Sequence, residues 1–423
     1  MFFVYNIAIT LILIAFWWCF ALALLLVPKF RAGFFQKMGA YSLNLPKRKT
    51  IWLHAVSVGE VNAVEKLVKQ LKVRFSDYNI VLSTVTKTGQ EVANKKLSSV
   101  CDAIVYFPFD FFWSVLMAIN AIKPSLVIIA ETEIWPNFSY ILKHKKIPFM
   151  IVNGRISPNS YKGYKNWGWF FAPILKNYTS ILMQTSSDAD RIRDIGASRD
   201  VQAEVMGNLK LDIQKNLEPE DVKKLSEELQ LNRRRVLVAG STHAGEDEIV
   251  LNVYEKLLDK YSDLKLIIAP RHPERYSDVI EMIEQTGYKF GLRSEGANVE
   301  DNDIIMIDTM GELASMYSIC HLAFIGGSFS GTGGHNPLEA TIYDKPTISG
   351  DIVFNFKDIY AILTEENASI LVKNEEEFFI FADKLMSDAD FYEKTVQNCE
   401  KVFEQNSGAV CYVLDKVEKI LED

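Results

Sequence analysis

The sequence predicts an α/β protein in which two Rossmann-like domains face a cleft, preceded by one N-terminal transmembrane helix. Three observations lead to this fold class. Short apolar strands alternate with amphipathic helices from residue 50 onward, and the alternation resumes after a charged stretch at 212–235. Such alternation is typical of a parallel sheet covered by helices on both faces. Ahead of both series, residues 7–27 form an apolar run without any charge.

The apolar run at 7–27 contains one hydroxyl, and as a helix it is long enough to span about 30 Å of hydrocarbon. A cleaved signal peptide usually has a basic start and a shorter apolar core, so we expect an uncleaved anchor. A buried core helix is the other alternative. No acidic residue precedes Glu60, but six basic residues do: Lys29, Arg31, Lys37, Lys47, Arg48 and Lys49. The positive-inside bias places the rest of the chain in the cytoplasm, with this segment against anionic membrane lipids.

Composition narrows the class of protein. The 423 residues carry 46 basic and 54 acidic side chains, a net charge of −8, and 48% of them are hydrophobic. This composition excludes a disordered chain, and the acidic balance argues against nucleic acid as a partner. The five cysteines are scattered without a CxxC pair, which favours a reduced compartment over a disulfide framework.

The apolar runs set the domain boundaries: an anchor at 1–28, a first domain at 29–212 and a second at 213–423. The expected strands of the first domain are 50–55, 79–84, 103–106, 126–129 and 148–152, with helices that include 61–75 and 89–97. The expected strands of the second domain are 236–239, 266–269, 304–307 and 322–325. The charged stretch at 212–235 is interpreted as a linker with a surface helix. A C-terminal helix that packs back on the first domain is compatible with these boundaries.

Glycine and polar side chains gather where the strands of the first domain end. Glu60 lies in the first turn of a helix, directly after Gly59, where a carboxylate either complements the helix dipole or performs chemistry. Glu131 follows the strand at 126–129, where a carboxylate is costly unless it is solvated or used; helix capping is the alternative. Lys210 closes the domain near the expected cleft, and an ordinary solvated lysine is the alternative there.

The strongest local pattern of the second domain is the glycine-rich stretch 326–340, which runs into a helix with Pro337 in its first turn. Free backbone N–H groups at that helix start predict an anion site, although a flexible loop is the alternative. Glu339 could accept hydrogen bonds from ribose hydroxyls, and Arg271 offers a planar fork suited to phosphate. The pattern is neither a P-loop nor a GxGxxG fingerprint, which disfavours ATPases and dehydrogenases.

No metal site and no cofactor are expected. Asp188 with Asp190 and Asp388 with Asp390 have the D-x-D form, but both pairs lie in Ser- and Asp-rich helix starts. We interpret them as helix caps.

Taken together, the motifs resemble those of the 3-deoxy-D-manno-octulosonic acid (Kdo) transferases of lipopolysaccharide synthesis, which are inverting glycosyltransferases of the GT-B fold. The resemblance covers nearly the whole chain, including the anchor. It rests on HAVSVGE at 54–60, ETEIWPN at 131–137, NGRIS at 153–157, GNLKLD at 207–212, GSTH at 240–243, PRH at 270–272, DTMGEL at 308–313, and GGSF and GGHNPLEA within 326–340.

The resemblance implies a reaction. The donor would be CMP-Kdo and the acceptor a lipid A precursor at the cytoplasmic face of the cell inner membrane, with no metal and no cofactor. The first domain would bind the acceptor and supply Glu60 as the general base, while Glu131 and Lys210 would stabilise the transition state. The residues implied to hold CMP are Pro270, Arg271, Met310, Gly311, Glu312, Asn336, Pro337, Leu338 and Glu339.

Two other functions stay open from the residues alone. One is another GT-B glycosyltransferase that uses a UDP-sugar on a membrane acceptor. The other is a catalytically idle, membrane-tethered module that binds a nucleotide. The presence of Glu60, Glu131 and Lys210 disfavours the idle module.

Overall fold

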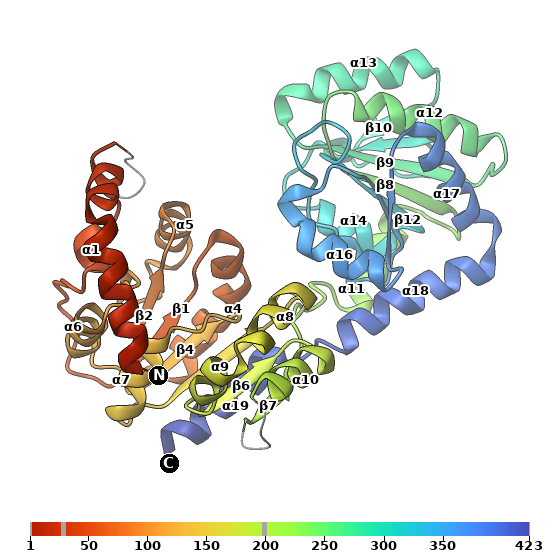
Figure 1. Ribbon diagram of the computed structural model, residues 1–423. Coiled ribbons are helices and arrows are strands. Elements are labelled where there is room, and N and C mark those ends of the chain that lie inside the picture. The colour runs from red at the N-terminus through yellow and green to blue at the C-terminus, as the bar shows by residue number, and fades with distance from the viewer. Residues whose placement is uncertain (1, 27–30, 197–200, 423) are drawn as a thin grey trace. The chain divides into compact units, whose positions relative to one another are not determined.

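The computed structural model describes residues 2–26, 31–196 and 201–422 (Figure 1). The chain divides into two compact units. Unit 1 comprises Met1–Asp212 with Asn406–Asp423, and unit 2 comprises Ile213–Gln405. Each unit contains one parallel sheet with helices on both faces, so the α/β class is confirmed.

The sheet of unit 1 has the order β3-β2-β1-β4-β5-β6-β7. Its strands are β1 (Thr50–His54), β2 (Asn79–Thr84), β3 (Ala103–Tyr106), β4 (Leu126–Ala130), β5 (Phe149–Gly154), β6 (Ser180–Met183) and β7 (Ala203–Val205). Successive strands first add on one side of β1 and then continue on the other side from β4. The strand order therefore reverses between β1 and β4, and the loops that leave these strands diverge there.

The sheet of unit 2 has the order β10-β11-β9-β8-β12-β13-β14. Its strands are β8 (Arg235–Thr242), β9 (Leu264–Pro270), β10 (Phe290–Leu292), β11 (Ile304–Met306), β12 (Leu322–Ile325), β13 (Thr347–Gly350) and β14 (Ser369–Val372). The same reversal occurs between β8 and β12. Each sheet therefore has one crevice of the kind in which ligands of α/β proteins bind.

Helices cover both faces of each sheet. Those of unit 1 are α1 (Phe2–Leu26), α3 (Phe34–Lys37), α4 (Val58–Arg74), α5 (Lys87–Leu97), α6 (Phe112–Ile122), α7 (Pro136–His144), α8 (Pro158–Asn166), α9 (Gly168–Leu175), α10 (Ser186–Ile195) and α19 (Ala409–Glu422). Those of unit 2 are α11 (Pro219–Glu228), α12 (Glu246–Leu258), α13 (Tyr276–Thr286), α14 (Leu313–Ile319), α15 (Leu338–Thr341), α16 (Lys357–Glu365), α17 (Glu375–Ser387) and α18 (Ala389–Glu404).

The core of unit 1 lies on both faces of its sheet because the central strands are buried throughout. Ile51 and Leu53 point into the core under α4, α5 and α19, whereas Trp52 points into the core under α6, α7 and α10. This alternation follows from the two-residue period of a strand. The C-terminal α19 contributes Val413 and Val417 to the first of these cores, so the end of the chain packs with unit 1.

All nine predicted strands are present, and the charged stretch contains the surface helix α11, which has no buried residue. The sequence analysis missed β6, β7, β10, β13 and β14. Each has only three or four residues, and β10 is half-buried throughout. Unlike the equally short β3, β11 and β12, each missed strand also contains a serine, threonine, glutamate or glycine, which interrupts the apolar run that marks a buried strand.

The N-terminal α1 packs against unit 1 through its first residues. Tyr5 donates a hydrogen bond to Asp110 at 2.9 Å, Asn6 donates to Asn137 at 2.7 Å, and the Phe2 ring stacks on Tyr140. In the part of the chain that the structure describes, no helix has a stretch long and apolar enough to cross a membrane. The transmembrane helix expected at 7–27 is therefore not supported. Its last residue and the Pro28 and Lys29 that follow lie outside the described residues.

Asp110 explains both the start of α7 and the attachment of α1. Its carboxylate accepts the backbone N–H groups of Asn137 and Phe138 at 3.0 and 2.9 Å, which caps α7 from another loop, and it also accepts the hydroxyl of Tyr5. Burial raises the pKa of Asp110 to about 6, against these hydrogen bonds. One buried carboxylate therefore joins three segments of unit 1.

We expect Asp110→Ala to lower the free energy of unfolding by about 3 kcal/mol, because it leaves two buried N–H groups and one hydroxyl without their acceptor. Thermal unfolding followed by circular dichroism measures this loss. The exposed Asp77 serves as the control, since Asp77→Ala removes a solvated carboxylate. Equal melting temperatures for the two variants would contradict the capping role.

Candidate active site

Glu60 is held at the start of α4, directly after β1. Its carboxylate accepts the backbone N–H of Val56 at 2.7 Å and the hydroxyl of Ser57, the N-cap residue, at 3.1 Å. The residue is 7% exposed. The predicted position in the first helical turn is confirmed, and the local hydrogen bonds fix the side chain at the carboxyl edge of the sheet.

Burial, together with the nearby carboxylates of Glu131 and Glu133, raises the pKa of Glu60 to about 7. The two hydrogen bonds from Val56 and Ser57 oppose this shift. Burial also raises the pKa of Glu133, with Glu131 acting in the same direction. The three carboxylates therefore influence one another, and Glu60 is poised to exchange a proton near neutral pH.

Glu131 follows β4, which is the neighbour of β1 across the strand reversal. Its backbone has a φ of 57°, a left-handed conformation that is uncommon for a residue with a side chain. The N–H of Glu131 donates to the carbonyl of Val152 on β5 at 2.9 Å, which holds this conformation. Strained backbone of this kind often occurs at functional sites, because the surrounding structure must enforce it.

Lys210 lies in a turn that is fastened to the end of β5. The side chain of Asn153, the penultimate residue of β5, accepts the N–H of Leu209 at 3.0 Å, and Asn208 accepts the N–H of Lys210 at 2.9 Å. Asn153 also has a left-handed φ of 55°. Lys210 is half-buried. Glu60, Glu131 and Lys210 thus all belong to segments held at the carboxyl ends of β1, β4 and β5.

The same edge contains polar atoms that the described residues leave without a hydrogen-bond partner. They are His54 Nε2 at the end of β1, Trp135 Nε1 after β4 and Asn153 Nδ2 at the end of β5. Sequence reasoning did not select these side chains. Buried polar atoms without a protein partner are costly, so this edge is prepared to bind a polar molecule or water.

In unit 2, the glycine-rich loop after β12 is bound by the protein's own carboxylate. Glu246 is 1% exposed and accepts the backbone N–H groups of Gly327, Ser328 and Phe329 at 2.7 to 2.8 Å. It also accepts the N–H of His243 at 2.9 Å. The N–H groups at 327–329 are therefore already used by Glu246.

The helix that follows this loop, α15, has four residues, with Pro337 at its N-cap position. Its dipole is correspondingly small. The N–H groups that Glu246 binds lie at 327–329, before this helix start, so the predicted anion site at the helix start stays a prediction.

The residues expected to hold CMP lie on three segments of unit 2. Pro270 ends β9, and the N–H of Arg271 donates to Thr242 of β8 at 3.0 Å. Met310 is 80% exposed, and Glu312 accepts a hydrogen bond from Arg293 at 3.1 Å. The other members precede or open other helices: Gly311 with a φ of 88° before α14, and Asn336, Pro337, Leu338 and Glu339 around the start of α15.

The charge of Arg271 affects the pKa of Glu339. Burial raises the pKa of Glu339, while a hydrogen bond with Asn336 and the charge of Arg271 act against that rise. Arg271, after β9, and Glu339, on α15, are therefore close at the carboxyl edge of the second sheet.

Three histidines lie at the same edge. His243 follows β8 and His272 follows β9; His335 lies in the glycine-rich loop. The Nε2 atoms of His243 and His335 are 2.9 Å apart, and the rings of His243 and His272 meet edge to face with centroids 5.3 Å apart. The sequence analysis quoted the motifs that contain these histidines but assigned them no role.

The two D-x-D pairs serve local structure. Asp188 accepts the N–H of Ile156 and closes the cap of α10 with Thr185, and Asp388 caps α18 by accepting the N–H of Phe391. Within the described ranges, no group of three or more His, Cys, Asp or Glu side chains is arranged to hold a metal ion.

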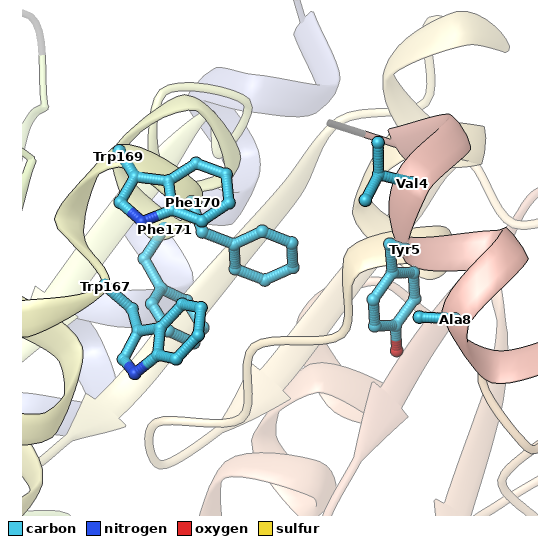
Figure 2. A pocket seen from close by; sticks show the side chains of 7 residues that line it. All are labelled: Val4, Tyr5, Ala8, Trp167, Trp169, Phe170 and Phe171. Carbon is cyan, nitrogen blue, oxygen red and sulfur yellow. The ribbon is translucent and has the colours of Figure 1, made fainter. Parts of the chain in front are cut away.

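An apolar pocket lies between α1 and α9 of unit 1. Figure 2 shows aromatic side chains from α9 and its N-cap on one side and side chains of α1 on the other. The volume is about 690 Å³, within the range of small-molecule sites. It is lined by Val4, Tyr5, Ala8, Trp167, Trp169, Phe170 and Phe171. Trp167 and Trp169 remain 58% and 65% exposed, so the pocket opens to the surface.

We expect Glu246→Gln to destabilise unit 2 by about 3 kcal/mol and to abolish ordering of the glycine-rich loop. Glutamine has an NH₂ group in place of one carboxylate oxygen. This NH₂ group would face buried backbone N–H groups that now donate to the carboxylate, and two donors cannot form a hydrogen bond with each other. Chemical denaturation and hydrogen exchange at 327–329 measure the two effects. Glu248→Gln, an exposed position on the same helix, is the matched control. Retained exchange protection in the Glu246 variant would refute this account of the loop.

Known proteins resemble this chain over different parts of its length. Residues 31–213 match the family described as 3-deoxy-D-manno-octulosonic-acid transferase (kdotransferase). The solved C-terminal CMP-Kdo binding domain of WaaA from Acinetobacter baumannii is 29% identical, covering 43% of this chain and 96% of that one, with a TM-score of 0.42. A bifunctional glycosyltransferase/methyltransferase of Fusobacterium nucleatum is 34% identical over 90% of this chain and 59% of that protein.

The 3-deoxy-D-manno-octulosonic acid transferase of Haemophilus influenzae is 33% identical over 402 residues, which is 93% of this chain and 93% of that protein. Such identity over almost the full length of both proteins confirms the resemblance drawn from the motifs. The chain therefore belongs to the 3-deoxy-D-manno-octulosonic acid transferase family and is a glycosyltransferase.

Proposed function

We propose that the protein transfers Kdo from CMP-Kdo to a lipid A precursor at the cytoplasmic face of the cell inner membrane, with inversion and without a metal ion. The observation that carries this proposal is Glu60, a buried carboxylate with a pKa of about 7 at the carboxyl edge of a parallel sheet. A glycosyltransferase needs a base for the acceptor hydroxyl, and a base is most effective when its pKa lies near the working pH.

In the proposed reaction, Glu60 removes the proton from a sugar hydroxyl of the acceptor as its oxygen attacks the anomeric carbon of Kdo. The new C–O bond forms while the bond from that carbon to the phosphate oxygen breaks, and CMP leaves with the electron pair. One displacement inverts the anomeric centre. Glu131 favours the developing positive charge on the sugar, and Lys210 favours negative charge on the carboxylate or phosphate.

The donor side of the proposal rests on the carboxyl edge of the second sheet. Arg271 supplies a permanent positive charge there, and Glu339 supplies a carboxylate that could accept ribose hydroxyls. The family resemblance adds Pro270, Gly311 and Asn336 to this set. Cationic side chains then perform the charge neutralisation that a metal ion performs in other transferases.

The acceptor side of the proposal rests on the apolar surface of α1 and α9. Phe3, Leu11 and Trp17 of α1 are 74%, 61% and 66% exposed, and Val4, Tyr5 and Ala8 of the same helix line the pocket with the aromatic residues of α9. Exposed apolar side chains gathered in this way mark a contact with lipid or protein. The exposed tryptophans Trp167 and Trp169 are of the residue type that is enriched where proteins meet the lipid headgroups.

We expect Glu60→Gln to lower turnover by about 10²- to 10⁴-fold without loss of CMP binding, because only the base is removed. The wild-type rate should rise with pH and level off above about 7. The pKa of Glu60 is raised, so the carboxylate is protonated and inactive below that value; at pH 6 about one tenth of the plateau rate remains. Product formation from CMP-Kdo and lipid A precursor, followed by mass spectrometry, measures both.

The exposed Glu91 provides the control for this test, and Glu91→Gln should retain the wild-type profile. Near-normal turnover of the Glu60 variant would exclude its role as the base. Inhibition by UDP with no inhibition by CMP would instead favour a glycosyltransferase that uses a UDP-sugar, and the donor assignment would then be wrong.

We expect the double variant Trp167→Ala, Trp169→Ala to raise the KM for the acylated acceptor by about tenfold and to leave kcat unchanged, since it removes apolar contacts remote from the reacting atoms. With an acceptor stripped of its acyl chains, wild type and variant should have equal KM values. Trp113→Ala removes a comparably exposed tryptophan on α6 outside the pocket and serves as the control. An equal rise for both acceptors would contradict a role in binding acyl chains.

A further inference from the structure

The reversal of strand order in unit 2 places two histidines on the two sides of one crevice. His243 follows β8 and His335 lies in the loop after β12, and these are the strands between which the order reverses. Their Nε2 atoms lie 2.9 Å apart, and their rings are nearly parallel with centroids 5.2 Å apart. The pair is therefore built from residues 92 positions apart in the sequence.

The backbone is adapted to this arrangement. Gly327 has a φ of 70°, and a Cβ on this residue would come within 2.9 Å of the His335 ring. The N–H of His335 donates to the carbonyl of Gly326 at 3.1 Å, while the N–H of His243 is held by Glu246. These hydrogen bonds hold the backbone of both histidines in place, and the two rings contact each other through their Nε2 atoms.

Several charged and titratable groups influence this pair. They are His272 and Arg271 after β9, Arg275 in the turn before α13, and Glu246 at the start of α12. Arg275 is paired with Asp247, and the Glu246 carboxylate accepts four backbone N–H groups. Burial, together with the neighbouring His243, Arg271 and His272, lowers the pKa of His335 to about 4. Burial also lowers the pKa of His243.

Two neutral imidazoles whose Nε2 atoms face each other share one proton: one Nε2–H donates and the other Nε2 accepts. An anion that enters between Arg271 and this pair requires N–H donors from both rings. Its negative charge also favours the charged form of the pair, against the burial that lowers both pKa values. Binding of the anion therefore draws one additional proton onto the two histidines.

We propose that His243 and His335 bind the phosphate of the nucleotide donor, together with Arg271, and that the pair takes up a proton when the nucleotide binds. This inference rests on the proposed CMP-sugar donor and specifies how its phosphate is recognised. A metal ion is the other common ligand of paired histidines. The described residues provide no group of three ligands placed for one.

The test is isothermal titration of the full chain with CMP at pH 7.5, in two buffers of different ionisation enthalpy. The difference between the two observed enthalpies gives the number of protons taken up. We expect an uptake approaching one proton per CMP, and an affinity that rises as the pH is lowered from 8 to 6. Cytidine, which lacks the phosphate, should bind without proton uptake.

His335→Gln and His243→Gln should each weaken CMP binding about tenfold or more at pH 7, because a charge-assisted hydrogen bond is lost. Each should also remove most of the proton uptake, an effect that a general loss of packing would not produce. His321→Gln is the matched control. His321 is a half-buried histidine of the same unit with its pKa likewise lowered to about 4 by burial, but it precedes β12 at the opposite edge of the sheet.

Binding of CMP without proton uptake, or uptake that persists in both variants, would overturn the histidine site while leaving the CMP-sugar donor in place. Proton-linked binding of UDP, with no binding of CMP, would keep the histidine site and overturn the donor. Melting temperatures of the variants decide whether a loss of binding reflects a loss of folding. If one variant fails to fold, the other still measures the proton uptake.

Discussion

Parallel pairing of the strands is the constraint on which the rest of the structure depends. Every strand pairing within the described residues is parallel, so all strands of a sheet end at the same edge. Loops can diverge only where the strand order reverses, which happens beside β1 in unit 1 and beside β8 in unit 2. Glu60 and Glu131 follow the two strands at the first reversal, and His243 and His335 follow the two strands at the second. The proposed catalytic and binding residues therefore lie where the topology leaves room for a ligand.

The buried carboxylates of this protein differ in the number of hydrogen-bond donors that surround them, and their roles differ accordingly. Glu246 accepts four backbone N–H groups and holds a loop in place. Asp110 accepts two N–H groups and a hydroxyl, and so joins a helix start to α1. Glu60 accepts only one N–H and one hydroxyl, and it lies near two other carboxylates. Burial, with the charges of Glu131 and Glu133 acting in the same direction, raises the pKa of Glu60 to about 7, which suits the proposed role of general base.

The features that could be predicted from the sequence are those that depend on neighbouring residues. Strands buried on both faces, such as β1 and β4, appear as continuous apolar runs, and the position of Glu60 in a first helical turn follows from its neighbours. The features that could not be predicted are contacts between residues that lie far apart in the sequence. The binding of the N–H groups at 327–329 by Glu246 is one example, since Glu246 is more than 80 residues away in the sequence. The contact between His243 and His335 is invisible for the same reason, since it exists only once β8 and β12 are paired.

The bound loop and the histidine pair give the two proposed steps opposite pH dependences. Because Glu246 already accepts the N–H groups of 327–329, we propose side chains as the phosphate ligands, among them His243 and His335, whose pKa values burial lowers. Lower pH favours the pair that carries one additional proton, and hence the proposed nucleotide binding. In the proposed reaction the base in unit 1 responds in the opposite sense, since Glu60 has to lose its proton before it can accept one from the acceptor. The proposed donor binding and proton abstraction therefore favour opposite ends of the same pH range, and we expect efficient transfer only in the interval in which both groups hold the required charge.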